Sequence, residues 1–321
     1  MVTLRQIAAV LPAHRRWGLA VSRVIVAAVM EAFGAPLAGA TAQPVRAQLP
    51  DGSYVRGQWV RAPGVERRDA AIYFVHGSGF VLCSPRTHRR LAASMSRLTR
   101  LPVFCVDYRL APEHSFPAAA DDVEAGWQWL TGTHSIAPKN IVIAGDSAGG
   151  HLAVDMLLAV SGPGPAGLLL FSPLIDLTFQ LARDRERLRR DPAIRARDAA
   201  RLVSLYLGDT DPTHPRVRLD VRNGNTLPPT LIQAGGAEML AADAHCLAED
   251  IRRAGGSCAL QVWPDQVHVF QALPKLTPAA AEALQHAALF IDRAVTATPF
   301  ESRDSASTPQ QSATDSRLRK G

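Results

Sequence analysis

Residues 145–150 surround a single serine, Ser147, with small side chains. An apolar β-branched run, residues 141–143, precedes them and a helix-like stretch begins at His151, which predicts a strand, a tight turn and a helix. So tight a turn strains the serine backbone, and a Cβ would fit badly at Gly145 and Gly149. The strain lifts the Ser147 hydroxyl clear of the sheet edge and directs the Ala148 amide at the same point. The pattern indicates a nucleophilic serine, although a Gly/Ser turn before an ordinary helix shares this spacing.

A serine hydroxyl needs a base to take its proton at neutral pH. In strand–turn–helix serine hydrolases the acid and then the histidine follow the serine along the chain, each after a later strand. Of the ten histidines, His268 lies in the loop after the last predicted strand, with a helix following. The sequence therefore predicts His268 as the base, a structural histidine being the alternative.

The acid that orients the base should follow the preceding strand, expected over residues 230–234. Glu238 is the first carboxylate beyond that strand, and Asp243 lies five residues further on, inside the next expected helix. Either residue type can orient an imidazole and stabilise its cation. Glu238 is favoured and Asp243 is the competing candidate.

An oxyanion hole should come from a loop after an earlier strand. The strand over residues 70–76 runs into a loop with Gly77, Ser78, Gly79 and Phe80, whose small residues let backbone amides approach a substrate oxygen. The amides of Gly77, Ser78 and Ala148 are the predicted donors, each contributing about 3 kcal/mol. His76 precedes the elbow and is expected to position the loop.

Strands and helices alternate around these residues. Strands are expected at 54–61, 70–76, 103–107, 141–143, 167–172, 230–234 and 258–263, and helices at 3–34, 86–100, 118–130, 151–160, 241–254 and 278–294. This alternation predicts an α/β fold with a mostly parallel sheet covered on both faces. The expected organisation is N-terminal cap helices (1–45), a core in two parts (46–176 and 227–297), a cap insertion (177–226) and a disordered Ser/Thr/Gln/Pro-rich tail (298–321).

The composition is that of a globular protein, with 47% hydrophobic and 20% charged residues and a net charge of +6. Arginines in the segment 183–201 alternate with acidic residues, which favours a solvated helix face over a phosphate-binding patch. Aromatic residues do not interleave with the basic ones, so nucleic acid is not an expected partner. The four cysteines share no metal-type or disulfide-framework spacing, and no metal or cofactor is expected.

The N-terminal stretch, residues 17–30, is apolar, follows two arginines and precedes the small residues 40–42, as in a secretory signal. Arg23 interrupts it, and the stretch is too short and too charged for stable membrane insertion. A cytoplasmic location is therefore expected, with the cell envelope or secretion as the alternative.

Several ordered motifs resemble the bacterial hormone-sensitive-lipase-type (family IV) carboxylesterases of the α/β-hydrolase superfamily. Residues 76–80 resemble that family's HGGGF, residues 107–113 its DYRLAPE, residues 145–150 its GDSAGG, and residues 172–176 its SP…D segment. Two departures occur: Ser78 replaces the middle glycine, and Glu238 stands where D-P-L-x-D is usual.

The resemblance implies that Ser147 is the nucleophile, His268 the base and Glu238 the acid, and that a cap shapes a pocket for short- to medium-chain acyl esters. Phe80 and Asp146 are expected to contribute to substrate binding, and Arg109, Glu113 and Asp122 to hold the loop near the site. The expected partner is a small ester, and a homodimer is possible. An amidase or lactonase on the same triad, or a ligand-binding pseudo-hydrolase, is the alternative.

Overall fold

The computed structural model describes residues 16–222 and 226–296, and the part described contains one eight-stranded sheet in the order β1-β2-β4-β3-β5-β6-β7-β8. The strands are β1 (Thr41–Gln48), β2 (Tyr54–Arg61), β3 (Ala71–Val75), β4 (Val103–Val106), β5 (Ile141–Asp146), β6 (Gly167–Phe171), β7 (Thr230–Gly235) and β8 (Cys258–Trp263). Neighbouring strands from β4 to β8 are parallel, while β1 pairs antiparallel with β2, and β2 with β4. The predicted α/β fold with a mostly parallel sheet is confirmed.

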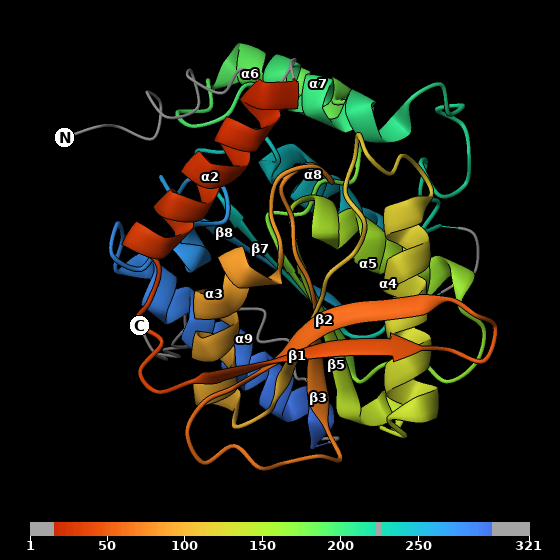
Figure 1. Cartoon of the computed structure of the whole chain (residues 1–321). Coiled ribbons are helices and arrows are strands. Elements are labelled where there is room, and N and C mark those ends of the chain that lie inside the picture. Colours follow the sequence, from red (N-terminus) through yellow and green to blue (C-terminus); the bar gives the residue numbers. More distant parts are fainter. Residues whose placement is uncertain (1–15, 223–225, 297–321) are drawn as a thin grey trace, which may run out of the picture.

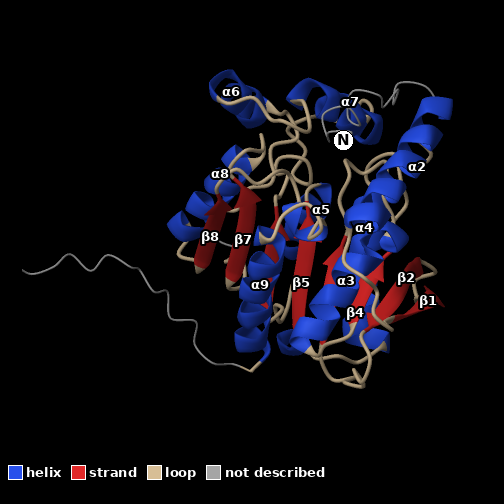
Figure 2. Ribbon diagram, turned by 90° about the vertical axis from the view of Figure 1, so that its left-hand side faces the viewer, coloured by secondary structure: helices blue, strands red, loops and turns tan. Residues whose placement is uncertain are grey.

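Helices cover both faces of the sheet (Figures 1 and 2). Alternate residues of each central strand belong to different cores: Tyr73 and Ile143 to one, Phe74 and Val142 to the other. The first core also takes in side chains of α4 (Ala118–Gln128), α5 (Ala148–Ala159) and α8 (Ala241–Arg253), and the second those of α3 (Pro85–Thr99) and α9 (Ala279–Val295). The strands are apolar on both sides because both sides are covered.

Three further helices lie at the carboxyl ends of the parallel strands: α2 (Arg16–Phe33), α6 (Gln180–Leu188) and α7 (Ala196–Leu207) (Figures 1 and 2). Arg23 of α2 donates to the carbonyls of Val81 and Ala111 and pairs with Glu113 at 3.0 Å. The arginine that interrupts the apolar N-terminal stretch thus docks α2 onto the segment that follows the predicted oxyanion loop. Short helical turns complete the described elements, at Trp129–Thr133, Pro138–Asn140 and Phe270–Ala272.

The strand β1 was not predicted and corrects the expectation of cap helices throughout residues 1–45. β1 is an edge strand that contains Pro44 and exposed polar residues, and Pro44 lies opposite Gln58. Proline is tolerated in a sheet at such an edge, where its missing N–H breaks no ladder. Two of the three small residues that resemble a cleavage site, 41 and 42, are the first residues of this strand. The predicted tail, and the start of the predicted N-terminal helix, lie outside the described residues.

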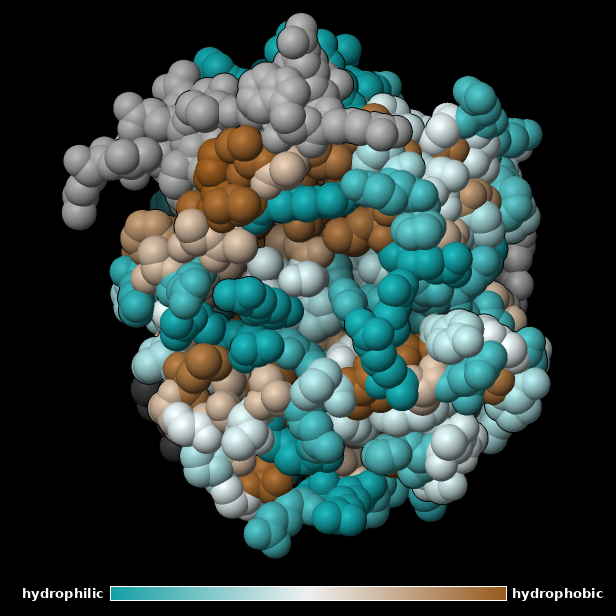
Figure 3. All heavy atoms as spheres, in the orientation of Figure 1, coloured by the Kyte–Doolittle hydropathy of each residue, from teal (hydrophilic) through white to brown (hydrophobic). Residues whose placement is uncertain are grey.

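Among the described residues, none of the helices combines the length and the apolar character needed to cross a bilayer. Hydrophobic side chains nevertheless gather along α2 at the surface (Figure 3), where Val21 and Val24 are 43% and 68% exposed. Elsewhere on this face, hydrophilic and hydrophobic side chains are interspersed (Figure 3).

Candidate active site

Ser147 occupies the turn between β5 and α5 with φ 51° and ψ −122°. Such a backbone costs a non-glycine residue about 1–3 kcal/mol and persists only where its surroundings hold it. The Ser147 amide donates to the Phe171 carbonyl at 3.0 Å, and the Ser147 carbonyl accepts the amides of Gly150 and Leu174. The strained elbow predicted from the sequence is present and is held by the neighbouring strand.

The glycines around Ser147 are required by close backbone approaches. A Cβ at Gly149 would lie 2.1 Å from the Val75 carbonyl oxygen, and one at Gly145 would lie 2.8 Å from the Gly149 oxygen. Contacts below 3.0 Å force a shift, and here the obstacles are backbone atoms. A Cβ therefore fits badly at both positions, as the sequence predicted, and the two glycines let α5 start directly against β3 and β5.

His268 and Glu238 form a direct pair. The imidazole Nδ1 lies 2.6 Å from the Glu238 carboxylate Oε2, and Oε1 of the same carboxylate accepts the Gly235 amide at 2.8 Å. Burial lowers the pKa of His268, but the hydrogen bond with Glu238 and the negative charges of Glu238, Asp191 and Asp146 together outweigh it, so the pKa lies above its ordinary value of 6.5. A carboxylate on Nδ1 leaves Nε2 to act as the proton acceptor.

A buried serine connects the His268 loop to the nucleophile's end of the sheet. The Ser172 hydroxyl accepts the Val269 amide at 3.1 Å, and Ser172 follows β6, whose last residue Phe171 accepts the Ser147 amide. Ser147, Glu238 and His268 follow β5, β7 and β8, which are parallel, so all three lie at the carboxyl edge of the sheet. The three predicted residues are thus brought to one edge.

Asp243, the competing candidate for the acid, has other partners. Its Oδ1 accepts the amides of Ile175 and Asp176, at 2.9 and 2.8 Å, and its Oδ2 has no partner among the described residues. Burial raises the pKa of Asp243 to about 7. Asp243 therefore holds the loop after β6, and Glu238 is the carboxylate that contacts the imidazole.

The predicted oxyanion loop follows β3 and lies against the elbow. Its residues Ser78, Gly79 and Phe80 have φ values of 81°, 63° and 64°, a run of left-handed backbone that turns the chain sharply. A Cβ at Gly77 would lie 2.8 Å from the Ser147 Cβ. The loop is therefore in contact with the nucleophile.

One predicted donor is already engaged. The Gly77 amide donates to the Asp146 Oδ1 at 3.0 Å, so it is not free to bind a substrate oxygen in this arrangement. The amides of Ser78 and Gly79 have no acceptor within the described part of the chain. The sequence does not predict this hydrogen bond, because the spacing of small residues does not reveal which amide of the loop faces the neighbouring carboxylate.

Asp146 and two histidines support this loop from beneath. His88 Nε2 lies 3.3 Å from Asp146 Oδ1, and the His76 ring stacks on Tyr108 at 4.2 Å, while the Tyr108 hydroxyl donates to the His76 carbonyl. Burial raises the pKa of Asp146, but the contact with His88 and smaller contributions from neighbouring histidines outweigh this, and the pKa lies below its ordinary value. Burial lowers the pKa of His76 to about 3, so His76 is neutral and positions the loop, as predicted.

The remaining predicted site residues have mainly supporting contacts. Phe80 is fully buried and stacks on Tyr206 of α7 at 4.2 Å, and Asp146 is occupied by the contacts above. Their expected contact with substrate stays a prediction. Arg109 donates to both oxygens of Asp122 at 2.8–3.0 Å, in keeping with a structural role.

The prediction that the arginine-rich segment 183–201 forms a solvated helix face is only partly right. Arg187 and Arg197 are exposed, but Asp191 is 3% exposed and Arg185 donates to two backbone carbonyls of the Glu238 loop. Regular alternation of charges conceals these inward contacts. A usable signal was the Asp191–Pro192 pair, which breaks the helical pattern in the middle of the segment.

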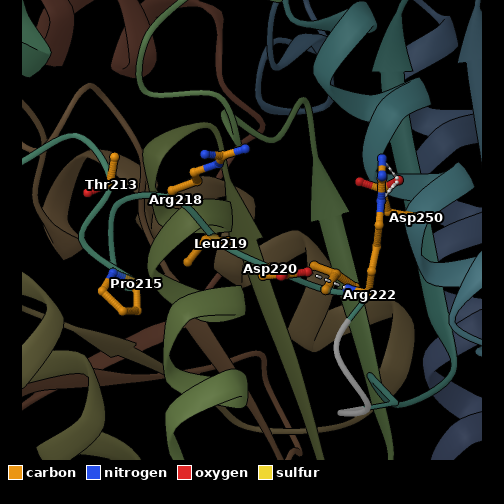
Figure 4. Close-up of a pocket in the computed structure, with 8 residues that line it drawn as sticks. Thr213, Pro215, Arg218, Leu219, Asp220, Arg222 and Asp250 are labelled. Carbon is orange, nitrogen blue, oxygen red and sulfur yellow. Dashed lines mark hydrogen bonds and ion pairs between the residues drawn. The ribbon is translucent and has the colours of Figure 1, made fainter.

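A cavity of about 600 Å³ lies away from these residues, between the segment after α7 and Asp250 of α8 (Figure 4). It is lined by Thr213, Pro215, Arg218, Leu219, Asp220, Val221, Arg222 and Asp250. None of the predicted catalytic residues is among them. Arg222 is paired with Asp250 at 2.7 Å, so this charge is already compensated.

The chain matches known proteins over most of its length. Residues 72–272 match a family model described as alpha/beta hydrolase fold. The carboxylesterase/phospholipase LipF of Mycobacterium tuberculosis is 36% identical over 246 residues, which cover 73% of this chain and 65% of LipF. The esterase LipU of the same organism is 34% identical over 278 residues, covering 80% of this chain and 93% of LipU.

Solved structures agree with these relatives. A crystal structure of an esterase from the bacterial hormone-sensitive lipase family is similar with a TM-score of 0.78 and 31% identity, covering 91% of this chain and 95% of that one. A mutant of the esterase E40 is similar with a TM-score of 0.81, also at 31% identity, covering 91% and 96%. The chain belongs to the α/β-hydrolase fold family and, within it, to the bacterial hormone-sensitive-lipase type.

Proposed function

We propose that this protein is a serine carboxylesterase that hydrolyses short- to medium-chain acyl esters through an acyl-enzyme. The observation that carries the proposal is the 2.6 Å contact of His268 Nδ1 with Glu238, on a loop tied by Ser172 to the end of the sheet where the strained Ser147 lies. The esterase names of the relatives, LipF and LipU, support the choice of bond.

In the proposed first half-reaction, the Ser147 oxygen attacks the ester carbonyl carbon while His268 Nε2 takes the hydroxyl proton. The tetrahedral intermediate collapses as His268 returns that proton to the leaving alcohol. A water molecule then attacks the acyl-enzyme, with the same imidazole as its base, and the acid is released. Glu238 stabilises the imidazolium in both halves.

The oxyanion of each tetrahedral intermediate needs amide donors. The Ala148 amide is the first of helix α5, where amides have no intrahelical acceptor and the helix dipole is positive. Because the Gly77 amide is bound to Asp146, we place the other donors at Ser78 and Gly79. Asp146, held by His88, then fixes the loop that carries them.

Two measurements test the proposal. Ser147→Ala should abolish turnover of p-nitrophenyl esters and covalent labelling by a fluorophosphonate while leaving thermal unfolding close to the wild type. A panel of esters, amides and lactones distinguishes a carboxylesterase from an amidase or lactonase using the same residues. A wild-type protein that binds such compounds without labelling or turnover would instead be a pseudo-hydrolase.

A further inference from the structure

The cap helix α6 contacts the backbone of the turn that carries Glu238. Arg185 Nε donates to the Glu238 carbonyl at 2.8 Å, and Arg185 Nη2 donates to the Gly236 carbonyl at 2.7 Å. The planar guanidinium offers its N–H groups in a fixed fork, so two simultaneous bonds determine the orientation of what they hold. Arg185 thus fixes the two carbonyls that bracket the turn carrying the acid.

A second cap residue holds the next amide of the same loop. Asp191 Oδ2 accepts the Met239 amide at 2.8 Å, while Asp191 Oδ1 accepts the amides of Ala193 and Ile194 at 2.7 and 3.0 Å. Both carboxylate oxygens are therefore used, one within the cap and one on the acid loop. Since Asp191 is buried, losing one of its acceptor oxygens would leave a buried backbone amide unpaired, which is unfavourable.

Two further amides of the acid loop bond the histidine loop. The amides of Gly236 and Ala237 donate to the carbonyls of Trp263 and Gln266, at 2.7 and 3.0 Å. The acid loop therefore lies between two sets of bonds, those of the His268 loop on one side and those of the cap on the other. Figure 2 shows α6 above the carboxyl ends of β7 and β8, from which the two loops leave the sheet.

We infer that Arg185 and Asp191 are positioning residues, through which the cap holds Glu238 against His268. The inference rests on the proposed function, because positioning matters only if the pair is catalytic. Under this inference the cap insertion has two roles: it is expected to shape the acyl pocket, and it also holds the Glu238 carboxylate in position. Displacing α6 would then lower the rate of the chemical step as well as the affinity for substrate.

The test compares four variants of the full-length chain by steady-state kinetics on a p-nitrophenyl ester. Arg185→Gln removes the guanidinium that bonds two carbonyls at once. Asp191→Asn replaces one carboxylate oxygen with an N–H₂ group, which faces a backbone N–H in either orientation of the amide. Both should lower kcat, by up to about 100-fold for a displaced catalytic group, with KM changed much less. Arg185→Lys, which can reach one carbonyl at a time, should recover part of the loss.

Arg187→Gln is the matched control, because Arg187 lies two residues along α6, is exposed and pairs only with Asp184 among the described residues. It should keep kcat within about twofold of the wild type, as expected of an exposed ion pair. Thermal unfolding of every variant separates folded, slow proteins from unfolded ones. If Arg185→Gln does not fold, the kcat and KM of Arg185→Lys decide the question.

A double-mutant cycle gives the decisive readout. In a Glu238→Gln background the acid is already lost, so Arg185→Gln should cost less than about twofold further, because residues acting as one unit are not additive. The inference is overturned if Arg185→Gln and Asp191→Asn keep wild-type kcat, or if Arg185→Gln costs the same factor in both backgrounds. Failure of the proposed function looks different: wild-type turnover would then survive Ser147→Ala.

Discussion

His268 Nδ1 lies 2.6 Å from the Glu238 carboxylate, although the two residues come from different loops. The contact is possible because β7 and β8 are adjacent and parallel, with Gly235 opposite Trp263, so both loops leave the same edge together. A Cβ at Gly235 would lie 2.3 Å from the Gln266 carbonyl oxygen, and a glycine there lets the loops touch. The contact between His268 and Glu238 therefore depends on the register of β7 and β8 and on the glycine at position 235.

Glu238→Gln should reduce kcat by about 10⁴-fold, as loss of the orienting carboxylate does in a Ser-His-Asp triad. It should also change the pH profile. The pKa of His268 is raised by Glu238 against the opposing effect of burial, so removing the charge lowers that pKa. The base is active when neutral, and the acidic limb of kcat/KM should therefore move to lower pH. An unmoved limb would mean that another group controls it.

Ser172→Ala should leave the buried Val269 amide without its acceptor and cost about 1–3 kcal/mol of unfolding free energy. Because Val269 adjoins His268, kcat should also fall while KM changes little. Chemical denaturation and steady-state kinetics measure the two effects. Ser204→Ala is the control, since its exposed hydroxyl bonds only the Arg201 carbonyl in the described chain. Equal losses in both variants would contradict a special role for Ser172.

Gly77→Ala should lower activity by at least about 100-fold, because the new Cβ would lie 2.5 Å from the Asp146 carbonyl oxygen and displace the oxyanion loop. Gly164→Ala adds the same methyl group where no atom lies within 4 Å, and should be silent. Ester turnover and circular dichroism of both variants are the measurements. A fully active Gly77→Ala protein would show that the loop has no part in the reaction.

Asp243→Asn should make stability less dependent on pH. The pKa of Asp243 is raised to about 7 in the fold from 3.8, so the wild type gains stability from this group below about pH 4 and loses it progressively as pH rises to 7. Asparagine keeps the oxygen that accepts the Ile175 and Asp176 amides and carries no charge. The Tm of the variant, measured from pH 5 to 8, should fall less than that of the wild type. If the Tm of the two proteins fell equally with pH, Asp243 would not be the group responsible for this part of the pH dependence.

The sequence was sufficient for features whose cause is local. Seven of the strands were predicted, most of them from apolar runs, and the elbow follows from glycines where a close backbone approach leaves no room for a Cβ. The edge strand β1 was missed, because its pairing with β2 overrides a polar, proline-containing pattern. The inward contacts of Arg185 and Asp191 were missed for a related reason: Arg185 of α6 and Asp191, which follows α6, bond backbone groups of the Glu238 loop about fifty positions away, and the local charge pattern does not record such contacts.

The central claim is that Ser147 is an activated nucleophile, and covalent labelling tests it most directly. Intact-mass analysis after reaction with a fluorophosphonate should show one adduct per chain, mapped to Ser147. The adduct should be absent in Ser147→Ala and formed much more slowly in His268→Ala. A wild-type protein that stays unlabelled while folded, or a label on another residue, would contradict the account.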